Sequence, residues 1–288
     1  TLNGGTPGAV NVGGTLIFNR SATVTENDLY AGTGTVVKAG AGTTILSSTS
    51  TFAGATFVSG GVLRVDGSWG LGTTMRVEQA GTLMGTGSAS GTVVVAGTVS
   101  PGASVGTLST GGEVWEPGAT YRFEVSDLTG TFGAHPGYDR LNVAGDLTIN
   151  ASPGNVFTVR VSTVDSGGGP ALPAHLAANA SYTMAFARVS GSIIGFDSAA
   201  FTVNLDAVAS LVAVTNVQVA QAGSDLVLVL QTGGAVSWAW DADTTPAGAQ
   251  DGDGTWDFVN TNWWGGSANT AWPDYRLGVF GGGTNGSG

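Results

Sequence analysis

Carboxylates are the first side chains in this sequence that could do chemistry. The chain has 20 Asp and Glu residues, and two carboxylates held roughly 5 to 10 Å apart can cleave a polysaccharide by general acid and base catalysis. The candidates are Asp139, Arg140 and Asp146, or Glu113, Glu116 and Glu124. Nothing in their spacing requires such a pair. Charges alternating along a solvated face explain them as well, and we favour that interpretation.

Histidine and lysine offer little more. His135 and His175 are the only histidines, and neither belongs to a serine-nucleophile elbow or a zinc-binding H-E-x-x-H motif. We therefore expect both histidines to lie in surface loops. Lys38 is the only lysine. It could form an isopeptide bond to an Asn or Asp of a surface fibre, but we interpret it as a solvated residue of a coil. The chain is therefore predicted to be non-enzymatic.

An acidic, Gly-rich segment could bind a hard cation, because calcium takes several carboxylate and carbonyl oxygens. Its candidate ligands are Asp241, Asp243, Asp251 and Asp253. The strict twelve-residue calcium loop is absent, since Asp241 and Asp243 are followed by Thr-Thr-Pro. A solvated turn is the other interpretation. Calcium is the one cofactor that the sequence leaves open, and a chelator-dependent shift in thermal stability would distinguish the two.

Most tryptophans lie near the C-terminal end of the sequence. They are Trp238, Trp240, Trp256, Trp263, Trp264 and Trp272. Exposed in a row, they could stack on sugar rings; buried, they could cover the end of a stack of strands or form a joint between subunits, where Trp is enriched. We favour the joint, with Phe280, Leu16 and Phe18 as further contacts. Trp263 and Trp264 are adjacent, so in a strand they point to opposite faces and at least one is expected to be buried.

Composition excludes several classes of protein. The net charge is −11 with only 9 Lys and Arg, too few for a basic groove, so nucleic acid is an unfavourable partner. No apolar run approaches the roughly 18 residues of a membrane helix, and we expect no direct membrane insertion. The hydrophobic fraction of 42% fits a folded chain. The absence of cysteine excludes disulfides and thiolate chemistry.

The elements that must position these residues are short strands with Gly at the corners. Gly contributes 49 residues, and runs rich in Thr, Val, Ile, Leu and Phe recur along the first part of the chain. Such runs predict a parallel β-solenoid, whereas the Asn-Gly and Asp-Gly turns of an antiparallel sandwich are scarce. The residues expected to stack inward are Val62, Leu63, Val65, Val77, Leu83, Val93 and Val95.

The chain divides into three regions on this interpretation. Residues 1–117 form short Gly-rich coils, residues 118–235 have longer strands that continue or cap the solenoid, and residues 236–288 form a Trp-, Asp- and Gly-rich segment at a junction with the next copy. Residues 174–180 are the only stretch that could make a helical turn or two.

Two neighbouring runs show the repeat most clearly. Residues 38–47 read K-A-G-A-G-T-T-I-L-S and residues 51–65 read T-F-A-G-A-T-F-V-S-G-G-V-L-R-V. Together they resemble the autotransporter-associated β-strand repeat of bacterial autotransporter passengers. Residues 99–108 and 138–145 are similar to segments that follow in the same proteins. A mild departure is Ser-Thr-Phe at residues 50–52, where the family has Asn-Thr-Tyr. The resemblance implies a right-handed β-helix on a bacterial cell surface and transfers no catalytic residue.

The order of segments is permuted relative to that family. Residues 240–280 resemble a segment that usually precedes the first strands, so residues 281–288 running into a copy of residues 1–18 would restore the order. The chain is then one period of a longer repetitive protein, or a subunit that self-associates head to tail. We predict an extracellular structural subunit of a surface filament. The alternatives are a monomeric adhesin that binds surface glycans and a β-helical polysaccharide-degrading enzyme.

Overall fold

A computed structural model describes most of the chain up to residue 240 and a few short strands beyond it. The described residues are 8–70, 74–207, 212–235, 237–240, 263–264, 269–270 and 277–279. Within them the chain is built of β-strands, and its helical element is one 3₁₀ turn, Ser198–Ala200. None of the described helical structure has the length and hydropathy needed to cross a membrane.

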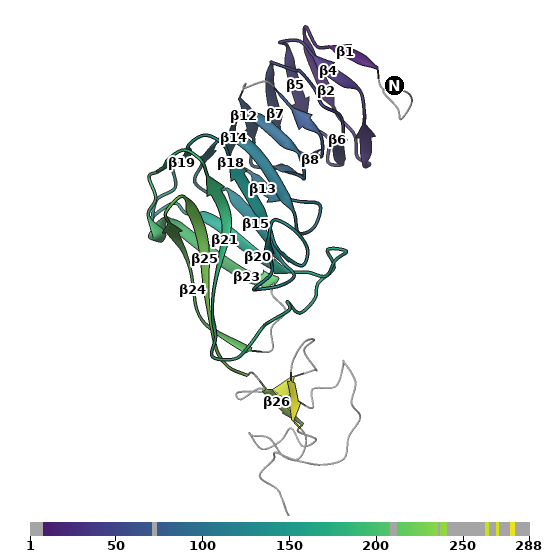
Figure 1. Cartoon of the computed structure of the whole chain (residues 1–288). Helices are drawn as coiled ribbons and strands as arrows, with labels where there is room; N and C mark the ends of the chain where they lie inside the picture. The colour runs from purple at the N-terminus through teal and green to yellow at the C-terminus, as the bar shows by residue number, and fades with distance from the viewer. Residues whose placement is uncertain are drawn as a thin grey trace, which may run out of the picture.

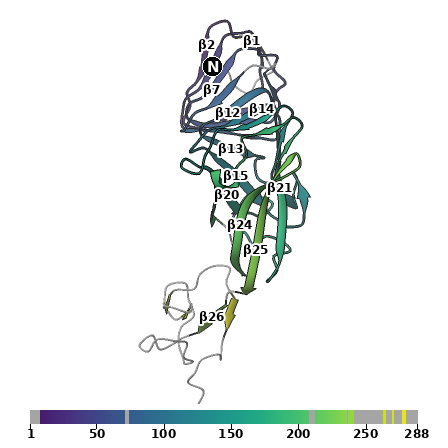
Figure 2. The same cartoon turned by 90° about the vertical axis from the view of Figure 1, so that its left-hand side faces the viewer.

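The strands wind into a solenoid of stacked coils (Figures 1 and 2). The early coils repeat about every 20 residues. For example, the backbone N–H of Gly8 donates a hydrogen bond to Oδ1 of Asp28, which lies 20 residues further along and in the next coil. The strands of these coils, in order, are β1 (Ala9–Asn11), β2 (Thr15–Phe18), β3 (Val24–Glu26), β4 (Leu29–Ala31), β5 (Thr35–Lys38), β6 (Thr43–Leu46), β7 (Ala55–Val58), β8 (Gly61–Val65), β9 (Ser68–Trp69), β10 (Met75–Val77) and β11 (Gly81–Gly85). Such short runs suit coils because each supplies one side of a turn of the solenoid.

The strands lengthen further along the chain. They are β12 (Ser88–Val95), β13 (Thr98–Pro101), β14 (Thr107–Trp115), β15 (Thr120–Val125), β18 (Arg140–Val143), β19 (Leu147–Ile149), β20 (Phe157–Thr163), β21 (Ser181–Val189), β22 (Ile193–Ile194) and β23 (Phe201–Ala207). Two short strands, β16 (Thr131–Phe132) and β17 (Gly137–Tyr138), lie in a loop between coils. The later coils therefore carry insertions that the early coils lack.

Parallel pairing gives the solenoid three faces. The first face is formed by β1 and β4 and then by β9, the start of β12, the start of β14, β18 and the end of β21. The second face follows β2, β5, β7, β10, the end of β12, the end of β14, β19 and β22. The third face follows β3, β6, β8, β11, β13, β15, β20 and β23. The predicted β-solenoid is confirmed.

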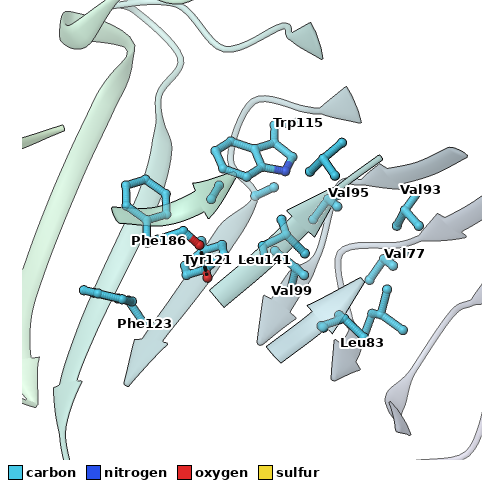
Figure 3. Packing of buried hydrophobic residues seen from close by; sticks show 14 of the residues in the cluster. Val77, Leu83, Val93, Val95, Val99, Trp115, Tyr121, Phe123, Leu141 and Phe186 are labelled. Carbon is cyan, nitrogen blue, oxygen red and sulfur yellow. Dashed lines mark hydrogen bonds between the residues drawn. The ribbon is translucent and has the colours of Figure 1, made fainter. Parts of the chain in front are cut away.

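Alternate residues of each strand point inward and stack in columns. On the second face, for example, Met75 pairs with Val93 and Val77 pairs with Val95, and all four are buried. Aromatic rings fill the wider later coils: Trp115 stacks on Phe157 with ring centroids 4.4 Å apart. Figure 3 shows Val77, Val93, Val95 and Trp115 among the buried side chains of one hydrophobic cluster. The side chains thus fill the space inside the coils, as the close packing of protein interiors requires.

An antiparallel hairpin follows the last coil. Strands β24 (Val212–Ala222) and β25 (Asp225–Ala235) pair with each other, and β25 also pairs with β21 in antiparallel register. A two-residue turn with Gly223 at a φ of 63° joins them. A separate four-stranded sheet consists of β26 (Ser237–Trp240), β27 (Trp263–Trp264), β28 (Asn269–Thr270) and β29 (Leu277–Val279).

Two expectations about local structure were wrong. Val62 was expected to point inward with Leu63, but it is half-buried on the outer side, where it pairs with Thr43 and Thr82. Adjacent strand residues cannot share a face, so only Leu63 joins the core. Residues 174–180 form turns instead of a helix.

Gly85 tests how far the corners depend on glycine. Its φ is 125°, and a Cβ there would lie 2.0 Å from the carbonyl oxygen of Val65. We expect Gly85→Ala to lower the free energy of unfolding by roughly 1 to 3 kcal/mol, because both strain and a backbone clash are introduced. Gly13→Ala is the matched control, since no atom lies within 4 Å of a Cβ there. Equal urea midpoints for the two variants would contradict the prediction.

Candidate functional site

Two residues predicted at a subunit junction lie in the first coil. Phe18 is buried and Leu16 half-buried in β2, and the ring of Phe18 meets that of Tyr30 edge-on at 5.9 Å between centroids. Ile17, between them, is 57% exposed. Among the described strands, β2 pairs with β5 alone, so its other edge presents unpaired backbone groups.

Four of the predicted junction tryptophans lie in the small four-stranded sheet. Trp238 and Trp240 belong to β26, Trp263 and Trp264 belong to β27, and Trp240 is paired with Trp263. Trp263 is 1% exposed, as expected for one of the adjacent pair. Leu16 and Phe18 belong to a different sheet. Trp256, Trp272 and Phe280 lie outside the described residues, and the junction stays a prediction.

The predicted calcium ligands cannot be placed. Asp241, Asp243, Asp251 and Asp253 all lie outside the described residues. Within the part of the chain that is described, no group of three or more His, Asp or Glu side chains comes together in a way that could hold a metal ion. Calcium binding by the acidic segment therefore stays a prediction.

Lys38 is buried, which overturns its interpretation as a solvated residue. Its exposure is 0%, and its place in the inward column lies between Phe18 and Val58 of the neighbouring coils. The ammonium donates to the backbone carbonyl oxygens of Gly40 and Gly60, at 2.9 Å for the second. Burial lowers the pKa of Lys38. Both acceptors are backbone carbonyls, which cannot form an isopeptide bond, so the geometry gives that crosslink no support.

Glu113 is also buried, contrary to the expectation of a solvated face. It occupies the inward column between Val93 and Leu147, where every other coil places an apolar or small side chain. Its Oε2 accepts a hydrogen bond from Trp115 Nε1 at 3.0 Å. Burial raises the pKa of Glu113 to about 8, although the hydrogen bonds act in the other direction. The carboxyl group is therefore mostly protonated at neutral pH, held in the core.

Asp139 is the other candidate carboxylate that proves to be buried. Its Oδ1 accepts from the backbone N–H of Gly106 and its Oδ2 from that of Glu124, both at 2.9 Å. Burial raises the pKa of Asp139 well above its ordinary value. Asp146 instead caps an outer corner by accepting from the N–H of Ser192 at 2.7 Å. Glu113, Asp139 and Asp146 thus serve separate structural contacts, whereas Glu124, whose Oε1 lies 3.8 Å from Arg122 Nη2, is close enough to Asp139 for its charge to help raise the pKa of Asp139.

A polar cluster that sequence reasoning missed lies just after β15. Ser126 Oγ is 2.9 Å from His135 Nδ1, and Asp127 Oδ1 is 2.8 Å from His175 Nδ1. The two histidines come from different inserted loops, and both are exposed, as predicted. The partners are 9 and 48 residues apart along the chain without a shared motif, so the sequence carries no signal for the cluster.

The cluster has the residue types of a hydrolase but not the connections. A serine nucleophile needs a base that a third group orients. Here the carboxylate of Asp127 binds the other histidine, while Ser126 is buried and accepts the N–H of Gly137 at 3.0 Å. Burial acts to raise the pKa of Asp127, but hydrogen bonds from Thr129 and His175 outweigh it and the pKa lies below its ordinary value. The arrangement fastens two loops to the two residues that follow β15.

Parallel coils stacked around a closed interior define the class of this protein as a β-helix. Comparison with known sequences shows which repeat family part of the chain resembles. Residues 36–65 match the family model described as Passenger-associated-transport-repeat. These residues include most of β5 and the whole of β6, β7 and β8, which form the second and third faces of two successive coils. The resemblance to autotransporter passengers, stated from the sequence, is confirmed.

Two relatives are similar over longer stretches. An extracellular serine protease of Serratia marcescens is 36% identical over 104 residues, which is 35% of this chain and 10% of the relative. The adhesin BmaC autotransporter of Brucella suis is 32% identical over 176 residues, or 58% of this chain and 5% of the relative. The chain therefore spans a tenth or less of either relative. The two names support an extracellular or cell-surface location.

Glu113 provides a test of the buried acid. Its pKa is about 8 in the folded chain against an ordinary value of 4.5, so between these two pH values the native state holds a proton that the unfolded state has lost. The resulting stabilisation is fully present below about pH 4.5 and is lost as the pH rises through about 8. We expect Glu113→Gln, which cannot ionise, to exceed the wild type in free energy of unfolding by roughly 1 to 3 kcal/mol near pH 9.

Urea unfolding of both proteins between about pH 5 and pH 9 measures this difference. Glu116→Gln is the matched control, because Glu116 lies on the outer side three residues further along the chain. A difference between wild type and Glu113→Gln that does not change with pH would show that the carboxyl group is not protonated in the core.

Proposed function

We propose that this chain is a non-enzymatic, rigid segment of a protein on the outer surface of a bacterium. The observation that carries the proposal is the interior: the columns of the described coils are filled by side chains, and the acidic residues that could have been catalytic serve structural contacts instead. A solenoid of this kind acts as a spacer whose length follows from its number of coils.

We further propose that the segment is joined end to end. Strands β1, β2 and β3 form the first coil of the stack. At the end of the stack that faces away from the second coil, the edges of these strands have no partner among the described strands. Leu16 and Phe18 end the apolar columns there. An open strand edge over an apolar column favours pairing with further coils. Those coils come from a preceding repeat of the same polypeptide or from a second copy of the chain, with the Trp-containing segment at the joint.

A monomeric adhesin is the second candidate. It is favoured by the relative named as an adhesin and by the tryptophans near the C-terminal end of the sequence other than the buried Trp263, which would stack on surface glycans if exposed. The name of the other relative favours an enzyme, but this chain covers only 10% of it and its Ser126 lacks the connections of a nucleophile.

Electron microscopy of the native material, combined with the intact mass of its chain, tests the proposal. Filaments whose chains have a mass near 28.5 kDa would mean that copies polymerise, and filaments of far larger chains would mean covalent repeats. Isolated monomers at high concentration would overturn end-to-end assembly and favour the adhesin.

A proline at the edge of the first coil gives a sharper test. The carbonyl of Gly14 already accepts from Thr35 in the next coil, so in a parallel pair the N–H of Thr15 points to the open edge. Thr15→Pro removes that donor, and we expect it to shorten filaments formed by the recombinant chain at least several-fold. Thr15→Val, which keeps the N–H, is the control and should assemble like the wild type. Filaments of unchanged length with Thr15→Pro would exclude this edge from the joint.

A further inference from the structure

Two arginines lie next to each other on the outer side of the third face. The register pairs Arg122 of β15 with Arg160 of β20, two strands that lie side by side (Figure 1), and both residues are exposed. Neighbouring strands are about 4.8 Å apart, so the two side chains leave the sheet close together. Like charges placed directly opposite each other destabilise a sheet. We call these two residues the arginine pair.

Two outward arginines of earlier coils have a counter-ion two positions further along. Arg64 Nε lies 2.8 Å from Asp66 Oδ2, and Arg76 Nε lies 3.0 Å from Glu78 Oε1. Residues two positions apart in a strand point to the same side of the sheet. Each of these ion pairs therefore neutralises a cation on the face that carries it.

Arg160 has no such counter-ion. The residue two positions further along is Ser162, and among the described residues Arg160 has no ion-pair partner. The register places Ser162 beside Glu124 of β15, whose Oε1 is 3.8 Å from Arg122 Nη2. Along these two strands one carboxylate therefore accompanies two guanidinium groups, and one positive charge is left over.

Arg140 shows how the fold treats another arginine that is followed by a neutral residue. Its guanidinium donates to Asn142 two positions further along, and the guanidinium carbon lies 4.6 Å from the centre of the Phe132 ring. A contact between a cation and an aromatic face is attractive. Among the described residues Arg160 has neither contact, so the arginine pair is the place where the solenoid presents positive charge without an internal use for it.

Hydroxyl groups flank the arginine pair. Thr120 and Thr158 lie two positions before the two arginines and pair with each other, and Thr158 pairs in turn with Thr202 of β23. The three threonines point to the same side of the sheet as the arginines. A hydroxyl group can both donate and accept a hydrogen bond. The surface therefore offers polar neutral partners beside its positive charge.

Charge and geometry decide which ligand fits this surface. Arginine binds a carboxylate through two parallel N–H donors, and two adjacent guanidinium groups can reach both oxygens of one carboxylate. The net charge of −11 opposes a densely charged polyanion such as a nucleic acid. A glycan in which carboxylates are separated by neutral sugars offers a single anionic group to the arginines and hydroxyl groups to the threonines.

We propose that the arginine pair and the threonines beside it bind a glycan whose carboxylate groups are spaced by neutral sugars. The site lies within one chain, so it needs neither joined ends nor the C-terminal tryptophans, and it goes beyond the rigid spacer proposed above. Its charges are exposed to solvent, so a single site binds weakly. Many copies on one cell surface bind a long glycan through many contacts at once.

A hyaluronan tetrasaccharide, in which glucuronate alternates with N-acetylglucosamine, is the probe. Chitotetraose, which is neutral and of the same length, is the matched control. In NMR titrations of the whole chain we expect the hyaluronan fragment to bind several-fold more tightly than chitotetraose, and added salt to reduce the difference. Equal binding of the two oligosaccharides, or binding of neither, would overturn the proposal.

Ser162 gives the sharpest variant, because it occupies the position where two earlier coils carry an acid. Ser162→Asp supplies Arg160 with a counter-ion, and we expect it to weaken binding of the hyaluronan fragment at least about fivefold. Ser162→Asn has a side chain of the same size without the charge and should bind like the wild type. Equal affinities of the two variants would exclude the arginine pair from the site.

Glu124 predicts a change of the opposite sign. Its carboxylate competes with the ligand for Arg122, so Glu124→Gln should tighten binding roughly two- to threefold. Arg160→Gln should weaken binding at least about tenfold. Arg64→Gln is the control on the same face, because Asp66 already neutralises Arg64, and it should leave the affinity unchanged. Weaker binding by Glu124→Gln would contradict the proposed geometry.

Stability separates a binding role from a structural one. Because Arg122 and Arg160 repel each other, Arg160→Gln should not lower the urea midpoint of the chain. A lowered midpoint would mean that Arg160 stabilises the sheet, which would overturn its assignment to a ligand. The same variant should form filaments of wild-type length, so a failure of glycan binding and a failure of the end-to-end joint are distinct results.

Discussion

The register of the parallel strands is the constraint on which the rest of this structure depends. In the solenoid each strand pairs with a strand one coil away, so a side chain is placed over and under the side chains at the same position of the neighbouring coils, which lie about 20 residues away in the early part of the chain. An inward position must therefore be filled in every coil, and a side chain of the wrong size or polarity disturbs the packing of the coil before it and the coil after it. The same register operates on the outside, where it stacks the outward residues of successive coils in columns.

This constraint explains why the sequence predicts the architecture well. Short runs such as residues 36–38 and 62–65, with glycine at their corners, can bury their apolar residues only by stacking, and the parallel coils follow. The same runs do not say which of two adjacent valines points inward. Val36 does and Val37 does not, just as Leu63 does and Val62 does not. Which residue points inward depends on where the preceding corner ends, because side chains alternate between the two sides from the first residue of the strand.

The polar residues were harder to predict because their roles depend on partners distant in the sequence. Lys38 and Glu113 look like surface residues by type, yet each occupies an inward position that the register assigns to its coil. Each is tolerated because a hydrogen-bonding group lies close by, the carbonyl of Gly60 for one and the indole of Trp115 for the other. The cluster at Ser126 and Asp127 depends on two loops whose contacts leave no pattern in the sequence, and the antiparallel pairing of β25 with β21 likewise joins segments with no common motif.

The widening of the coils along the chain also bears on how the protein folds. Ala9 pairs with Leu29, a separation of 20 residues, whereas Leu141 pairs with Ala187, a separation of 46. Loop-closure entropy makes the second pairing about 0.7 kcal/mol more costly than the first, before any cost of ordering the inserted loops. The narrow coils therefore close fastest and offer a template for the next strand, so the solenoid is expected to grow from its N-terminal coils toward the β24–β25 hairpin. The coil that is slowest to form is the one that the hairpin covers.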